Sequence, residues 1–184
     1  CTDWKRGPLP EQRRAQARMA RENGDWNLLD WRRHFCNVSV LPGGMFFPDE
    51  GEAAMDYVQA CLDKHAEYDV KTCPTTLLTQ HYRPDLSREQ CEDKMRAATD
   101  RWKDHPALLG YWLVDEPQAA QAEDFYWGKE FIQRLDPEHP ALCTCNNELA
   151  VREFAPSLRI TCIDDYPLHQ RPRRSRGPWA VGDI

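Results

Sequence analysis

HPALLGYWLVDEP, residues 105–117, is an apolar run that stops abruptly at two acids and a proline. A short continuous apolar run predicts a buried strand of a parallel sheet, here over 108–114. Pro117 cannot continue the strand ladder but suits the first turn of a helix. The strand therefore carries Asp115 and Glu116 to its carboxyl end, where α/β barrels keep their chemistry. The spacing also fits a plain helix start, with Asp115 as the cap and Glu116 in the first turn.

Strand and helix patterns alternate along the rest of the chain. Two capping boxes, Asp49 with Glu52 and Ser87 with Gln90, indicate helix starts. Further helices are expected at 10–33, with a break near 23–24, and at 119–135 and 148–158. Further strands are expected at 35–41, 68–78, 141–145 and 160–163. This alternation predicts an α/β fold with a parallel sheet and crossover helices.

Polar groups follow each expected strand after the first, and the carboxyl ends of parallel strands meet at one mouth. Turns favour Asn and Asp in any case, which is a sufficient explanation for Asn147 and Asp164. The strand-end groups are Gln80-His81-Tyr82, Asp115-Glu116, Asn146-Asn147 and Asp164-Asp165-Tyr166.

The string HPALLGYWLVDEP resembles the fourth-strand segment of the large clan of retaining (β/α)8-barrel glycoside hydrolases. In that clan a Glu-Pro preceded by Asn ends the fourth strand, and the Glu is the general acid/base. Here Asp115 replaces the Asn, and an ionised Asp cannot donate the hydrogen bond that Asn gives to a sugar hydroxyl. The resemblance covers about residues 28–167 and is specific at the fourth strand.

The resemblance implies a role for each strand-end residue. Glu116 is the expected catalytic acid/base, and Asp115 and Asn146 are expected substrate ligands. His81 is expected to line the substrate subsite and Tyr166 to orient the nucleophile, although His81 also fits a surface residue and Tyr166 a packed turn. The nucleophile is a Glu of the seventh strand, about 5–5.5 Å from the acid/base in a retaining enzyme.

Length bears on how much of a barrel is present. The chain has 184 residues, whereas a complete barrel needs about 250. We expect residues 1–184 to form a single incomplete (β/α)8 catalytic domain holding strands two to six, inactive alone because the nucleophile strand is missing. A small complete α/β domain is the alternative, with metal-assisted hydrolysis by His81, Asp115, Glu116 and Asp164. A non-catalytic carbohydrate-binding or degenerate barrel is another.

The resemblance implies a carbohydrate substrate, and composition argues against other classes of partner. The formal net charge of -6 argues against nucleic acid. No apolar run approaches the roughly 20 residues of a membrane span. No cofactor and no metal are expected, because no compact ligand motif is present. The resemblance slightly favours an extracellular or periplasmic location; oligomeric state stays open.

Cysteine and tryptophan residues look structural at first sight. Eight cysteines fall mostly in expected strands and helices, where free thiols pack as small hydrophobes. Cys143 and Cys145 are two residues apart on a strand, so both thiols are expected on one face. Trp112 and Trp127 can stack on a sugar, but Trp112 lies within a strand, where a core position is expected. Trp179 is the alternative stacking residue.

Overall fold

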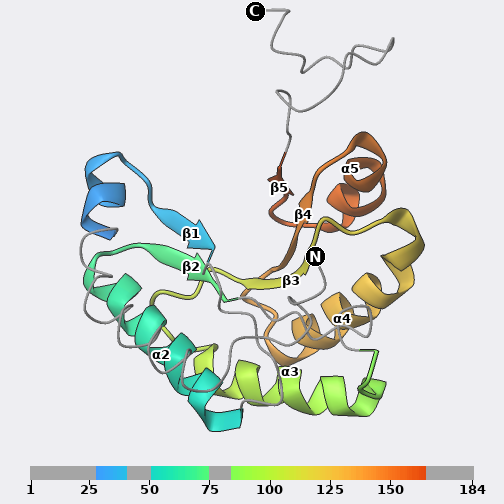
Figure 1. Ribbon diagram of the computed structural model, residues 1–184, viewed down its shortest axis with the longest axis horizontal. Coiled ribbons are helices and arrows are strands. Elements are labelled where there is room, and N and C mark those ends of the chain that lie inside the picture. Colours follow the sequence, from blue (N-terminus) through green and yellow to red (C-terminus); the bar gives the residue numbers. More distant parts are fainter. Residues whose placement is uncertain (1–27, 41–50, 75–83, 165–184) are drawn as a thin grey trace, which may run out of the picture.

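The computed structural model describes residues 28–40, 51–74 and 84–164 (Figure 1). Residues 28–33 are helical, and short 3-10 turns precede α4 and follow α5, at Ala119–Gln121 and Ala155–Ser157. The remaining elements alternate between strand and helix, as the sequence predicts. They are β1 (Val38–Val40), α2 (Gly51–Glu67), β2 (Lys71–Cys73), α3 (Arg88–Trp102), β3 (Tyr111–Asp115), α4 (Ala122–Leu135), β4 (Ala141–Cys145), α5 (Glu148–Phe154) and β5 (Cys162–Ile163).

All strand pairs in the described residues are parallel. β1 pairs with β2, and β3, β4 and β5 form a second sheet in that order. A parallel bridge between Thr72 and Leu108 joins the two sheets. There the Thr72 N–H donates to Ala107 O over 2.8 Å, and the Leu109 N–H donates to Thr72 O over 2.9 Å. The strands thus follow chain order, and within the described residues they do not close into a barrel.

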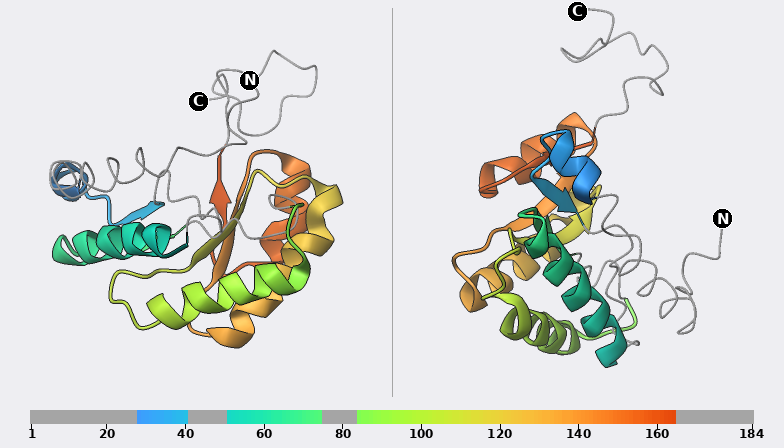
Figure 2. Two further views of the ribbon diagram at one scale, coloured as in Figure 1. Left: turned by 60° about the horizontal axis from the view of Figure 1, so that its bottom comes forward. Right: turned by 90° about the vertical axis from the view of Figure 1, so that its left-hand side faces the viewer.

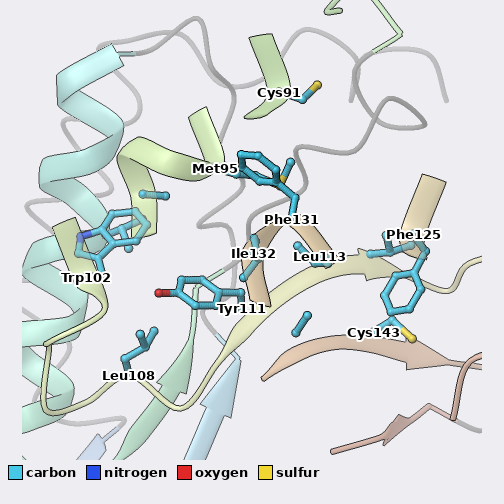
Figure 3. Close-up of a cluster of buried hydrophobic side chains, with 14 of the residues drawn as sticks. Cys91, Met95, Trp102, Leu108, Tyr111, Leu113, Phe125, Phe131, Ile132 and Cys143 are labelled. Atoms are coloured by element: carbon cyan, nitrogen blue, oxygen red, sulfur yellow. The ribbon is translucent and has the colours of Figure 1, made fainter. Parts of the chain in front are cut away.

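Helices α2 to α5 lie outside the arc of strands (Figures 1 and 2). Between them is the helix-side core, a cluster of buried side chains from α2 to α5 and from β3 and β4. Figure 3 shows Tyr111 and Leu113 of β3 among Met95 of α3 and Phe131 and Ile132 of α4. None of the described helices is long and apolar enough to cross a bilayer.

A register shift in β3 decides which side chains leave that core. Trp112 pairs with Leu142 and Asp115 pairs with Thr144, and the shift lies between Trp112 and Val114. Leu142 and Thr144 are two residues apart on β4, so they face the same side of the sheet. The extra residue places Trp112 and Asp115 on that side too, while Leu113 and Val114 both stay in the helix-side core. We call the side of Trp112, Leu142, Thr144 and Asp115 the inner face.

Local signals predicted α3 well. Ser87 and Gln90 form the expected capping box: the Gln90 N–H donates to Ser87 Oγ over 3.2 Å and the Ser87 N–H donates to Gln90 Oε1 over 2.8 Å. The expected stripe of the helix is buried, namely Cys91, Met95, Ala98 and Trp102. The other expected box, Asp49 with Glu52, lies outside what the structure describes.

Several strand bounds differ from expectation. β3 begins at Tyr111 rather than 108, because Leu108 and Leu109 lie alongside Thr72 of β2. β2 begins at Lys71 rather than 68, since Asp69 takes a φ of 54° in the turn after α2. β1 begins at Val38 rather than 35, because Phe35 has a φ of 61°.

None of the cysteines in the described residues forms a disulfide. Cys36, expected in a strand, instead precedes β1 and is exposed, so its assignment to a buried strand is wrong. Cys143 Sγ and Cys145 Sγ lie 3.7 Å apart, which confirms that both thiols share a face. Burial raises the pKa of the Cys73 thiol to about 12, so this thiol stays protonated at neutral pH.

Two buried polar networks tie helices to strands. At the amino end of β3 the Tyr111 hydroxyl donates to Asp136 Oδ2, just after α4. Near β1 the Ser39 hydroxyl lies 2.7 Å from His65 Nε2 of α2 and 3.1 Å from Thr72 Oγ1 of β2. His65 Nδ1 lies 2.6 Å from the Cys61 carbonyl. Because a carbonyl only accepts, Nδ1 donates to Cys61, while the Ser39 hydroxyl donates to Thr72 Oγ1.

Candidate functional site

The carboxyl ends of β3, β4 and β5 lie level with one another. The Glu116 N–H donates to Thr144 O over 2.9 Å, and the Asp164 N–H donates to Cys145 O over 2.9 Å. These two backbone bonds continue the parallel pairing one residue beyond β3 and β5. They bring four predicted polar residues to one edge of the sheet. We call Asp115, Glu116, Asn146 and Asp164 the strand-end site.

Glu116 has a left-handed backbone, with a φ of 48°. This conformation is unfavourable for any residue with a Cβ, by about 1–2 kcal/mol. Glu116 also precedes Pro117, and a following proline normally drives a residue into extended backbone. Local preference is therefore overridden at this position, and strained positions of this kind cluster at functional sites.

Asp115 lies on the inner face and is exposed to solvent. Desolvation raises the pKa of its carboxyl, and the nearby negative charges of Glu116 and Asp164 raise it further. Three carboxyl groups at one edge cannot all ionise without mutual repulsion. Asp115 is therefore the member that keeps its proton to higher pH than an isolated Asp, and in that form it can donate a hydrogen bond.

The plain helix start considered for Asp115 and Glu116 is not what the structure contains. The 3-10 turn after β3 begins at Ala119, and its cap is Gln118 rather than Asp115. Asp115 still belongs to the strand and pairs with Thr144. Both acids therefore end a strand instead of beginning a helix, as the strand interpretation predicts.

The two Asn residues after β4, Asn146 and Asn147, have different roles. Asn147 caps α5, because its Oδ1 accepts from the Ala150 N–H over 2.9 Å. Its Nδ2 donates to Asn146 Oδ1 over 2.7 Å, which fixes the amide of Asn146 at the strand end. The turn explanation thus holds for Asn147, and Asn146 remains in the strand-end site.

The structure brings together part of the predicted site. Asp115, Glu116, Asn146 and Asp164 meet at the carboxyl ends of β3, β4 and β5. His81 and Tyr166 lie outside the described residues, so their roles stay predictions. Sequence reasoning missed Thr144, which pairs with Asp115 on the inner face. The one feature of the sequence that indicates Thr144 is its position as a polar residue between Cys143 and Cys145.

The chemistry open to the strand-end site is that of carboxyl groups. A carboxyl can transfer a proton as a general acid or base, and a carboxamide such as Asn146 can bind hydroxyl groups. Within the described residues, no group of three or more His, Cys, Asp or Glu side chains is placed to hold a metal ion. Neither a family model nor a curated protein matches the sequence, so the residues and geometry of this site carry the functional assignment.

Proposed function

We propose that this chain is part of a (β/α)8-barrel glycoside hydrolase in which Glu116 is the general acid/base. One observation carries the proposal: Glu116 has a strained, left-handed backbone at the carboxyl end of a buried parallel strand. It directly follows Asp115, and its N–H donates to Thr144 O of the neighbouring strand. A strained acid at the edge where barrel enzymes keep their active sites points to a catalytic group.

The proposed fold is the open arc extended into a barrel, with β1 to β5 as strands two to six. The parallel pairing in chain order and the helices outside the arc support it. In this arrangement β3 is the fourth strand. The remaining strands, including the seventh strand with its nucleophile, would complete the mouth.

In the proposed reaction Glu116 first protonates the oxygen of the leaving group. A nucleophilic carboxylate attacks the anomeric carbon, and the glycosyl–enzyme bond is then broken by water that Glu116 deprotonates. Asp115 and Asn146 would bind sugar hydroxyls beside it. Asp115 in its protonated form supplies the donor that an ionised carboxylate lacks.

The proposal is tested on the full-length protein with a panel of aryl glycosides. The Glu116→Ala variant should lose activity and recover part of it with added azide, because azide attacks the glycosyl–enzyme bond in place of water and needs no general base. The matched control is Glu130→Ala, which removes an exposed acid of α4 and should change nothing. A protein that binds sugars but cleaves no glycoside would contradict the catalytic role and favour a carbohydrate-binding barrel.

A further inference from the structure

Trp112 does not belong to the helix-side core, where its place within a strand would put it. Its neighbours Tyr111 and Leu113 are fully buried in that core. Trp112 instead pairs with Leu142 on the inner face and is only partly buried. Its backbone N–H donates to Pro74 O over 3.1 Å, which holds this part of β3 against the residue that follows β2.

The inner face has two levels. Asp115 and its partner Thr144 form the upper level, at the strand ends with Asp164. Trp112 and its partner Leu142 form the level below, about 7 Å nearer the amino ends of the strands, the rise of two strand residues. An apolar level therefore lies directly beneath a polar one that carries the strand-end acids.

We infer that Trp112 is a ligand-binding residue that stacks against the C–H face of a sugar ring held at the strand ends. This inference rests on the proposed function. A pyranose ring has apolar C–H faces and a hydroxyl edge, which match an indole below and carboxyl and hydroxyl groups above. Binding sites commonly combine an aromatic surface with a few polar groups in this way.

The charge of the upper level narrows the sugar to an uncharged one. The negative charges of Glu116 and Asp164, which raise the pKa of Asp115, also repel an anionic ring such as a uronic acid. Discrimination of this kind works through repulsion of the wrong ligand as much as through contacts with the right one. The inferred ligand is therefore a neutral hexose or pentose unit.

Trp127 provides a matched control because it is also partly buried but lies between α3 and α4. Its Nε1–H donates to Glu92 Oε1 over 3.1 Å, and the Arg88 guanidinium lies 5.1 Å from its ring centroid. Arg88 occupies a face of this indole, on the opposite side of the sheet from Asp115. A sugar bound at the strand ends would not reach it.

The test is calorimetric titration of the full-length protein carrying Glu116→Gln, so that bound sugar is not cleaved. The probes are cellotetraose, xylotetraose, mannotetraose and, as the anionic comparison, tetragalacturonic acid. Adding Trp112→Ala should weaken binding of the preferred neutral sugar about tenfold. Trp112→Phe should restore most of the affinity, Trp127→Ala should leave it unchanged, and the anionic tetramer should not bind.

Fluorine NMR of the protein labelled with 5-fluorotryptophan covers the case in which Trp112→Ala fails to fold. The resonance absent in Trp112→Phe should shift on addition of the neutral sugar, while that of Trp127 stays in place. Sugar binding with an unmoved Trp112 resonance, or with full affinity in Trp112→Ala, would overturn the inference and leave the proposed function standing. A parent protein that binds none of the four sugars would overturn the proposed function itself.

Discussion

The Tyr111 hydroxyl donates a 2.8 Å hydrogen bond to Asp136, which joins the buried start of β3 to the end of α4. The Asp136 carboxylate also accepts from His139 Nδ1 over 2.8 Å and from the backbone N–H groups of Glu138 and His139 over 3.2 Å. Burial alone would raise the pKa of Asp136, but the hydrogen bonds from Tyr111 and His139 outweigh it and hold that pKa below its ordinary value. The charged form is thus the stable one at neutral pH.

Replacing Tyr111 by Phe should lower the free energy of unfolding by about 1.5–3 kcal/mol, because the buried carboxylate loses a charge-assisted hydrogen bond. Urea denaturation at pH 7 measures the loss. The control is Tyr126→Phe, whose hydroxyl donates to the Glu153 carbonyl near the surface over 2.7 Å. Its loss should be below about 1 kcal/mol. Equal losses in the two variants would contradict a special role for the Asp136 network.

Backbone strain at Glu116 predicts a difference between two variants that both lack the carboxyl. Glu116→Gly should be more stable than Glu116→Ala by about 1 kcal/mol, because only glycine adopts the φ of 48° without a steric penalty. The greater freedom of glycine in the unfolded chain offsets part of this gain. Chemical denaturation of both variants gives the difference. An Ala variant at least as stable as the Gly variant would argue against strain.

Because the pKa of Asp115 is raised, we expect ionisation of this carboxyl to destabilise the fold. Above its folded-state pKa the ionised carboxyl destabilises the fold, and protonation relieves this as the pH falls toward the unfolded value near 4. Asp115→Asn should therefore melt at a higher temperature than the parent at pH 7, with a gap that narrows as the pH is lowered to 4.5. Thermal melts across this range measure the gap, and Asp93→Asn, at an exposed position of α3, reports the effect of removing a surface charge. A gap that widens toward acid pH would contradict the shift.

For His65 we expect the opposite dependence on pH, with stability lost as the pH falls. Burial lowers the pKa of its imidazole, and the hydrogen bond with the Cys61 carbonyl offsets this only partly. Below the unfolded value near 6.5 the unfolded chain binds the proton first, so stability should fall as the pH drops through and below 6.5.

The matched comparison is between His65→Gln and His34→Gln, because the side chain of His34 is exposed. Urea midpoints at pH 7.5, 6.5 and 5.5 should fall more steeply in the parent and in His34→Gln than in His65→Gln. Parallel pH profiles in all three proteins would show that His65 is not the responsible group.

Local signals predicted local structure, and long-range pairing decided what they missed. Ser87 with Gln90 announces α3 because cap and stripe lie within a few residues of one another. The sequence predicts Leu108 as part of β3. In the structure Leu108 pairs with Thr72 of β2 instead, and β3 begins only after Gly110. An added Cβ on Gly110 would lie 2.4 Å from Pro140 O, so only glycine allows this approach of β3 to β4.

For the strand-end site too, local signals in the sequence predicted the residues, and long-range pairing decided how they are arranged. Asp115, Glu116 and Asn146 were predicted from the abrupt ends of apolar strands, and the level strand ends bring them together. The inner-face position of Trp112 was not predicted, because an all-apolar strand has no alternation to show which side each residue faces. The register shift beside Leu113 settles that question, and it depends on β4.

The thiols of this protein differ in solvent exposure, so the rates at which they are chemically labelled report how often the fold opens. Cys36 is exposed, Cys162 is half-buried, and Cys61, Cys73, Cys91, Cys143 and Cys145 are buried. A thiol-reactive dye in excess will therefore label Cys36 at the rate of the free reagent. It will reach the thiols of the helix-side core, Cys61, Cys91, Cys143 and Cys145, only when the sheet separates from its helices. The slow labelling phases then time local opening and global unfolding separately, without any introduced probe.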